Sequence, residues 1–198
     1  MKKIILPLLT SFLFASNLDT VMLDLDKKNY DEAIKILKQQ EETPQIDFLL
    51  GKAYYERHLT YTDYIFAIKY FKKAKTPQSF YYLGKMYQNG LGTKKDIKEA
   101  IRYYKLSNTK EAKYELAKMY LDGKYLLKDP KIAINLLKDS AKEGYDKAQL
   151  LLGKLYLEPN EIMDKDLREA AKWLYLSAQN GNQEAKDLWN KYKLYKFQ

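Results

Sequence analysis

The chain has 198 residues, no cysteine, one histidine and a formal net charge of +9. Without cysteine it has no disulfides, thiol nucleophiles or cysteine-based metal sites, and a single histidine leaves little for a histidine triad or a two-histidine metal site. Basic and acidic residues are interleaved along the chain. Such mixing is typical of a solvated surface, although the basic balance favours an anionic partner.

The first 16 residues have the pattern of a secretory signal peptide. Met1-Lys2-Lys3 precedes the apolar run Ile4 to Phe14, and the small residues Ala15 and Ser16 follow it. The run is too short to cross a bilayer, and no later stretch approaches the roughly 20 apolar residues that a spanning helix needs. We therefore expect an exported mature chain, periplasmic or secreted, with no transmembrane segment and no nucleic-acid partner. An uncleaved N-terminal anchor is the competing interpretation.

Residues 17–44 predict a partial structural unit. Within them, Asn29 stands where a helix N-cap belongs, Glu32 follows three residues later, and Ala33 begins an apolar pattern of helical period that ends at Leu37. This segment matches the second helix of the repeats that follow it.

A five-residue motif, Leu-Gly-Lys-x-Tyr, then recurs along the chain. The four copies, one of them with alanine in place of glycine, are Leu50 to Tyr54, Leu83 to Tyr87, Leu116 to Tyr120 and Leu152 to Tyr156. The spacings of 33, 33 and 36 residues are those of a solenoid built from helix pairs. The same register predicts the core positions Ile46, Leu50, Tyr54, Ser79, Leu83, Tyr87, Ala112, Leu116, Tyr120, Ala148, Leu152 and Tyr156.

A second periodic column marks the other helix of each pair. It consists of Ala67, Ala100, Ala133 and Ala170, each preceded by an aspartate four residues earlier. A carboxylate at a helix start accepts hydrogen bonds from unpaired backbone N–H groups. We therefore predict that the aspartates are N-caps and not catalytic acids: Asp63, Asp96, Asp129 and Asp166.

The glycines fall at positions that the repeat determines. Gly51, Gly84 and Gly153 share one column of the first helices, where the lack of a side chain allows the paired helix to approach closely, and Ala117 takes the fourth place. The other glycines lie in turns, where positive φ is commonly required: Gly90, Gly92, Gly123, Gly144 and Gly181.

The predicted fold is all-α, an α/α superhelical solenoid of antiparallel helix pairs. After the signal peptide (1–16) we expect a single solenoid over 17–198 with no second domain. Its predicted parts are the partial unit 17–44, repeats at about 45–77, 78–109, 110–146 and 147–182, and a C-terminal capping helix over 183–198.

These columns resemble the Sel1-like repeat family, which is related to tetratricopeptide repeats. The residues that carry the resemblance are Leu83-Gly84, Tyr87, Gly90, Gly92, Asp96, Ala100, Tyr103-Tyr104, Asp166, Ala170-Ala171, Trp173-Leu174, Ser177-Ala178 and Gly181. The resemblance implies an adaptor that binds proteins or peptides, without catalysis or cofactor. Residues 30–37 look more like a tetratricopeptide second helix. The chain departs from the family in its turns at 57–62 and 159–163, and it lacks the cysteines that some exported members have.

A second stripe on the first helices pairs an apolar or aromatic residue with a lysine. By resemblance these helices line the concave face of the solenoid, and the candidate binding residues are Phe48, Lys52, Tyr81, Lys85, Gln88, Tyr114, Lys118 and Lys154, with Leu150 beside the last. Rings that flank ammonium groups suit an acidic or carboxylate-ended peptide. The alternative is that the lysines are merely solvated and the rings pack between repeats.

Two other functions stay open. Ser107-Asn108-Thr109-Lys110 formally matches Ser-x-x-Lys, the nucleophile motif of serine β-lactamases, and related repeat proteins carry that label. No Ser-Asp-Asn or Lys-Thr-Gly partner accompanies the motif, so we interpret Ser107 as a small packing residue in the column of Ala74, Ser140 and Ser177. The alternatives are therefore a hydrolase of β-lactams or cell-wall peptides and a protein that binds anionic cell-wall glycan.

Overall fold

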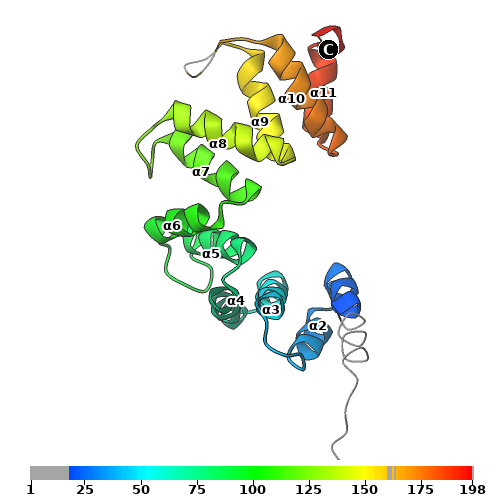
Figure 1. Ribbon diagram of the computed structural model, residues 1–198, viewed down its shortest axis with the longest axis vertical. Coiled ribbons are helices and arrows are strands. Elements are labelled where there is room, and N and C mark those ends of the chain that lie inside the picture. Colours follow the sequence, from blue (N-terminus) through cyan, green and yellow to red (C-terminus); the bar gives the residue numbers. More distant parts are fainter. Residues whose placement is uncertain (1–17, 160–161, 163, 198) are drawn as a thin grey trace, which may run out of the picture. The chain divides into compact units, whose positions relative to one another are not determined.

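The computed structural model describes residues 18–159, 162 and 164–197, and every regular element in this part of the chain is helical (Figure 1). The all-α prediction is confirmed. The expected signal peptide, residues 1–16, lies outside the described residues. The chain divides into two compact units, residues 1–100 and 101–198.

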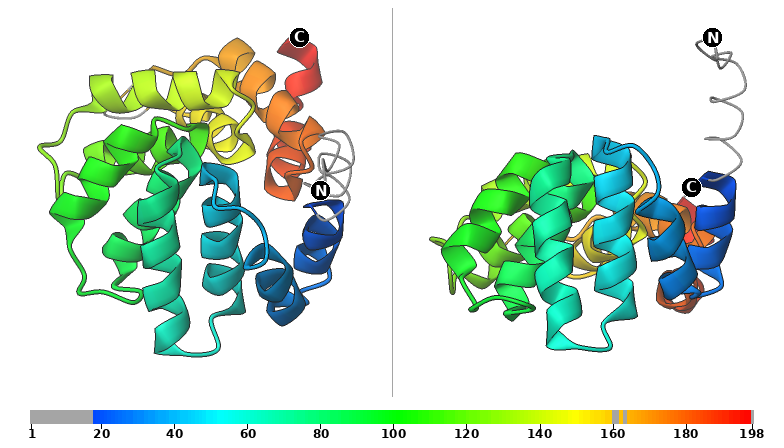
Figure 2. Two further views of the ribbon diagram at one scale, coloured as in Figure 1. Left: turned by 60° about the horizontal axis from the view of Figure 1, so that its bottom comes forward. Right: turned by 90° about the horizontal axis from the view of Figure 1, so that it is seen from below.

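The first unit contains a helical stretch over 18–26 and three complete helix pairings. Its further helices are α2 (Tyr30–Leu37), α3 (Pro44–Arg57), α4 (Tyr61–Ala74), α5 (Pro77–Asn89) and the start of α6 (Ile97–Ser107). Helix α2 packs on α3, α3 on α4, and α4 on α5. In Figure 2, α3 and α4 lie side by side and are joined at one end by a short loop, so they are antiparallel.

The second unit continues the same arrangement. Its helices are α7 (Lys110–Asp122), α8 (Pro130–Lys142), α9 (Asp146–Leu157), α10 (Leu167–Gln179), α11 (Gln183–Lys191) and the 3-10 turn η1 (Leu194–Phe197). Each of these helices from α7 to α11 packs on the next, and η1 packs on α10 and α11.

Threonines start three of the first helices. The hydroxyl oxygens of Thr43, Thr76 and Thr109 accept hydrogen bonds from the backbone N–H three residues later, at 3.2, 3.1 and 3.4 Å. Proline follows the cap in α3 and α5, at the position where a missing N–H costs nothing. These caps recur every 33 residues and fix where each repeat begins.

Aspartates start the later second helices, as predicted. Asp96 accepts from the N–H of Glu99 at 3.0 Å and Asp129 from that of Ile132 at 3.0 Å. Asp166 accepts from the N–H groups of Arg168 and Glu169, at 2.9 and 3.1 Å.

The predicted cap at Asp63 is wrong. Helix α4 starts one turn earlier, because Thr60 is its N-cap and Asp63 is the third helical residue, with which Thr60 forms a capping box. Asp63 is buried and hydrogen-bonded to Arg57. Asn29 does occupy the N-cap position of α2, but its side chain makes no cap hydrogen bond and donates to Asp24 instead, at 3.3 Å.

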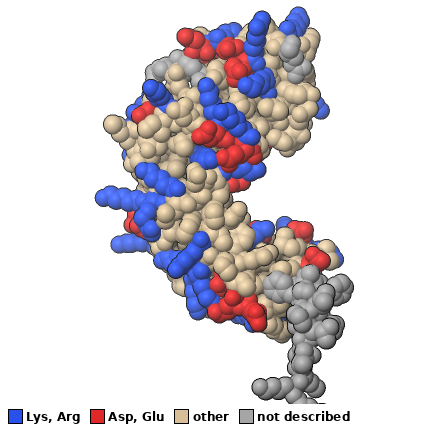
Figure 3. Space-filling view, viewed as in Figure 1, with Lys and Arg blue, Asp and Glu red and all other residues tan. Residues whose placement is uncertain are grey.

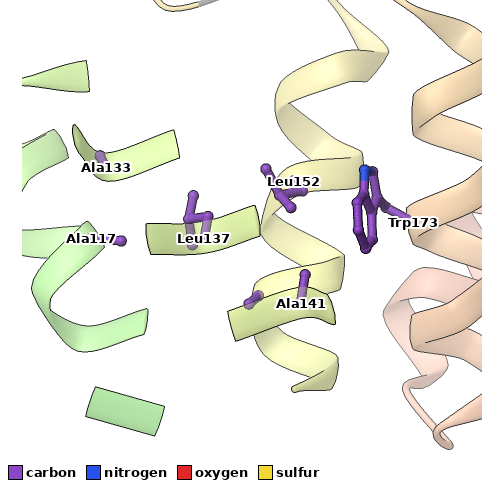
Figure 4. Close-up of a cluster of buried hydrophobic side chains, with 7 residues drawn as sticks. Ala117, Ala133, Leu137, Ala141, Leu152 and Trp173 are labelled. Carbon is purple, nitrogen blue, oxygen red and sulfur yellow. The ribbon is translucent and has the colours of Figure 1, made fainter. Parts of the chain in front are cut away.

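The predicted core column is largely buried. Its leucines, alanines, Ile46, Tyr54 and Ser79 are buried, and its three later tyrosines, Tyr87, Tyr120 and Tyr156, are half-buried. Figure 4 shows the core of the second unit, where Leu137 of α8 and Leu152 of α9 lie among alanines and Leu152 points toward Trp173 of α10.

Two glycines of the predicted column, Gly51 and Gly153, allow close contact between the paired helices. A Cβ at Gly51 would lie 2.6 Å from the Phe71 ring, and a Cβ at Gly153 would lie 2.5 Å from Leu174. Both distances are far below van der Waals contact, so α3 and α9 need glycine where each meets the second helix of its own repeat, whereas α7 accommodates Ala117.

Candidate functional site

The stripe residues of the first unit lie on α3 and α5 and are half-buried. Phe48 lies with its ring centroid 6.0 Å from those of both Phe71 and Tyr82, and Tyr81 lies 5.6 Å from Tyr82. The ring of Phe48 therefore takes part in packing between the first two repeats, whereas Tyr81 meets its neighbour on α5, and part of each side chain stays accessible.

The lysines of the first unit have different neighbours. The Nζ atom of Lys52 lies 3.8 Å from Glu56 one turn along α3. Lys85 instead lies between two rings, with its Nζ atom 5.6 Å from the centroids of both Tyr55 and Tyr81. An ammonium group this close to aromatic faces is attracted by their electrons. Gln88, the last candidate on α5, is half-buried.

In the second unit the stripe lies on α7 and α9. Lys118 has its Nζ atom 5.2 Å from the Tyr114 ring and 3.1 Å from Glu115. Tyr114 is half-buried and meets Tyr145 edge-on, with the ring centroids 5.3 Å apart. The ring and ammonium pairing seen at Lys85 thus recurs one repeat later.

A cavity of about 370 Å³ opens beside this part of the stripe, and we call it the α9 cavity. It brings together three residues of the predicted stripe, Tyr114, Leu150 and Lys154. Four further lining residues were not predicted: Lys147, Leu151, Asn182 and Glu184. Lys154 forms an ion pair with Glu184, which lies in the first turn of α11, thirty residues later. Only the packing of α11 against α9 reveals this partner.

Two tyrosines beside the cavity keep their protons at physiological pH. Burial, followed by the charges of Glu115 and Glu111, raises the pKa of Tyr145 to about 12. Burial also raises the pKa of Tyr114, and the nearby charges of Lys118 and Lys154 act in the opposite direction. Both phenols can therefore donate hydrogen bonds.

On the face drawn in Figure 3, basic and acidic side chains lie next to one another. Within the described part of the chain, no group of three or more histidine, cysteine, aspartate and glutamate side chains is placed to hold a metal ion. None of the described helices is both long and apolar enough to cross a membrane.

The Ser-x-x-Lys residues have neighbours that suit a structural role. Ser107 is buried at the end of α6, with its Oγ atom 3.1 Å from the Thr109 hydroxyl. Lys110 points to the backbone carbonyl of Glu143, with Nζ and oxygen 3.5 Å apart.

Two serines of the same column close their repeats. The Ser140 hydroxyl donates to the Lys110 carbonyl at 2.7 Å, and the Ser177 hydroxyl donates to the Asp146 carbonyl at 2.9 Å. In each case the end of the second helix is bonded to the start of the first helix of the same repeat. The sequence indicated a small residue here, but not a hydrogen bond.

Four segments of the chain, residues 47–76, 78–108, 110–145 and 146–182, match the Sel1 repeat family. A Sel1 repeat protein from Oxalobacter formigenes is 26% identical and superimposes with a TM-score of 0.75, over 87% of this chain and 74% of its own. A protective antigen present in uropathogenic Escherichia coli strains, which displays the same fold, is 26% identical with a TM-score of 0.67 over 77% of this chain. The present chain spans only 34% of that antigen. No curated protein matches the sequence.

Sel1 repeats are generally non-catalytic scaffolds that commonly bind other proteins. The helix pairs, the glycine contacts and the four matched segments lead to one conclusion: the chain is an all-α solenoid protein and belongs to the Sel1 repeat family.

Proposed function

We propose that the chain is an exported adaptor, periplasmic or secreted, that binds a protein or peptide partner through the stripe on its first helices and carries out no reaction. The observation that carries this proposal is that a lysine lies against the tyrosine four residues before it at the same position of the first helices in two successive repeats. Lys85 lies against Tyr55 and Tyr81, and Lys118 lies against Tyr114. Such pairs offer apolar area and positive charge at the same place, which suits an acidic segment of a partner.

The experiment that tests partner binding is affinity capture from an envelope extract of the source organism, with chemical cross-linking and mass spectrometry. The test variant replaces the four stripe lysines by glutamine: Lys52, Lys85, Lys118 and Lys154. Glutamine is preferable to glutamate, since Glu56, Glu115 and Glu184 pair with three of these lysines and would repel a new carboxylate.

A matched control removes four charges from the second helices instead. Lys69, Lys98, Lys131 and Lys172 are exposed, one on each of α4, α6, α8 and α10. We expect a partner that the wild type and the control variant retain and that the stripe variant loses. A partner retained equally by all three proteins would place binding elsewhere on the chain. Salt-sensitive sedimentation with purified cell wall, and no retained protein, would favour the glycan alternative.

Export has a separate test. The mass of the protein recovered from the envelope fraction should correspond to a chain that begins near residue 17. Recovery of the full-length chain from the membrane would favour the uncleaved anchor.

A further inference from the structure

The lining of the α9 cavity combines apolar and charged side chains. Leu150 and Leu151 of α9 and the ring of Tyr114 supply apolar surface, and we call the three charged side chains, Lys147, Lys154 and Glu184, its rim. Its volume of about 370 Å³ lies in the range of about 300–1,000 Å³ that is usual for ligand pockets. The cavity therefore contains three stripe residues, Tyr114, Leu150 and Lys154, together with lining residues that do not belong to the stripe.

The charges of the rim do not balance. Two ammonium groups face one carboxylate, and that carboxylate, Glu184, pairs with Lys154. Within residues 18–159, 162 and 164–197, no acidic side chain pairs with Lys147, which is exposed. The lining thus carries one more ammonium group than carboxylate, and the next acidic side chain, Asp146, is bonded to the Asn182 amide.

The pair of Lys154 and Glu184 can be opened at little cost. Their side chains are 41% and 57% exposed, and ion pairs exposed to this degree contribute little to stability. Asn182, in contrast, is fixed in the wall of the cavity. Its carbonyl oxygen accepts from the N–H of Ala185 at 3.1 Å and its amide donates to Asp146 at 3.2 Å. A ligand would therefore displace Glu184 and leave the start of α11 in place.

We propose that the α9 cavity binds a peptide segment in which a carboxylate stands beside a large apolar side chain. The apolar side chain packs on Leu150, Leu151 and Tyr114, and the carboxylate takes the place of Glu184 against Lys154, with Lys147 beside it. This assignment rests on the proposed function and names the ligand class of one site within it. A polyanion is a poorer fit, because it binds through cationic groups alone and makes no use of apolar surface. The α9 cavity offers apolar surface and also carries an acidic side chain in its rim, which would repel a polyanion.

Fluorescence anisotropy with labelled peptides in a fixed Gly-Ser frame tests the assignment. The probes carry Asp-Leu, Asn-Leu, Asp-Gly or Lys-Leu at their centre. The proteins are the wild type, Lys154→Gln, Glu184→Gln, and two controls, Lys172→Gln and Glu158→Gln, whose residues belong to exposed ion pairs that do not line the cavity. Thermal melts of all five proteins confirm that they are folded.

The two test variants should change affinity in opposite directions. The Asp-Leu peptide should bind best to the wild type. Its affinity should fall about fivefold with Lys154→Gln, because a charged contact to the peptide is lost. Its affinity should rise about threefold with Glu184→Gln, because a carboxylate that competes with the peptide for Lys154 is lost. Neither control should change its affinity by as much as twofold. The Asn-Leu peptide should respond to none of these substitutions.

Several results would overturn the assignment. Equal binding of the Asp-Leu and Asn-Leu peptides would show that the cavity does not recognise the carboxylate. Equal binding of the Asp-Leu and Asp-Gly peptides would show that it does not recognise the apolar side chain. Weaker binding of Asp-Leu with Glu184→Gln would show that the ion pair supports the site instead of competing. If capture of the partner depends on the stripe lysines, while the affinity of the Asp-Leu peptide does not change with Lys154→Gln or Glu184→Gln, the cavity assignment fails and the adaptor proposal stands. If the stripe variant captures whatever the wild type does and the peptides behave as expected, the adaptor proposal fails and the cavity assignment stands.

Discussion

Phe71 occupies the space that any side chain at Gly51 would need. A Cβ atom built on Gly51 would lie 2.6 Å from Cδ1 and 2.7 Å from Cε1 of the Phe71 ring. The ring is fully buried and stacks on Tyr82, with centroids 4.9 Å apart and planes 12° from parallel. Because Tyr82 belongs to the next repeat, a displaced Phe71 would disturb two repeats at once.

Gly51→Ala should therefore destabilise the protein, although alanine is the better helix former. Its higher helix propensity favours folding by up to about 1 kcal/mol, whereas overpacking costs about 1–3 kcal/mol. We expect a net loss of about 1–2 kcal/mol in the free energy of unfolding, measured by urea denaturation followed by circular dichroism.

A second substitution separates the clash from other causes. Phe71→Ala removes the Cγ, Cδ1 and Cε1 atoms that meet the new Cβ, so the double variant should be more stable than the sum of the two single losses predicts. Simple additivity of the two substitutions would contradict the close contact.

Asp63 should make stability depend on acid pH. Burial raises the pKa of this carboxyl, but hydrogen bonds from Arg57 and from the backbone of Thr60 and Leu59 outweigh burial and lower the pKa below its usual value. A carboxyl whose pKa is lower in the folded state adds stability above its unfolded pKa of about 4, and this stability is lost as the pH falls through the lower folded value. Asp63→Asn should be less stable than the wild type at pH 7, and the difference should shrink below pH 4.

Urea denaturation at pH 7, 5, 4 and 3 measures this effect. Asp129→Asn is the matched control, because asparagine caps a helix as well as aspartate does and Asp129 lies in an exposed cap. The prediction is contradicted if the wild type and Asp63→Asn lose stability in parallel between pH 5 and pH 3.

Ser177→Ala should remove the hydrogen bond that closes the fourth repeat. Ser177 is fully buried, and its loss leaves the Asp146 carbonyl without this donor. The expected cost is about 1 kcal/mol, or up to about 3 if no other group satisfies the carbonyl. Ser177→Cys keeps a weak donor of similar shape and should lose less. Equal stability of Ser177→Ala and the wild type, in urea denaturation, would contradict a structural role for this hydroxyl.

The protein should not hydrolyse the chromogenic β-lactam nitrocefin. Ser107 lies against Thr109 and Lys110 points to the Glu143 carbonyl, so neither is arranged as a nucleophile and its base. The absorbance change should equal that of buffer for the wild type and for Ser107→Ala. Hydrolysis by the wild type that Ser107→Ala abolishes would restore the enzyme alternative.

The repeat register could be predicted from the sequence because each of its determinants is local and periodic. The glycine at 51 and the aspartates at 129 and 166 serve one purpose each, and the structure confirms it. The prediction for Asp63 is wrong because this residue lies in the same column as true caps, whereas Thr60, three residues earlier, is the N-cap and forms the capping box. The threonine caps at 43, 76 and 109, spaced by 33 residues, were a signal in the sequence that the column of aspartates obscured.

The candidate site was less accessible to prediction. The stripe on the first helices follows from helical periodicity, but its neighbours come from other repeats. Glu184 reaches Lys154 from thirty residues further along the chain, and Tyr82 meets Phe48 across a repeat boundary. Such contacts depend on how one helix pair packs on the next, which periodicity does not specify. Whether the stripe residues bind a partner therefore stays a prediction.

The serine hydrogen bonds have a consequence for how such a chain can grow. Ser140 bonds to Lys110 thirty residues before it, and Ser177 bonds to Asp146 thirty-one residues before it, so donor and acceptor belong to one repeat. Duplication of a gene segment that encodes one repeat would copy both partners together, and deletion would remove both. Neither event would leave the hydroxyl of this serine or its acceptor carbonyl unsatisfied, so these hydrogen bonds allow the number of repeats to change in evolution.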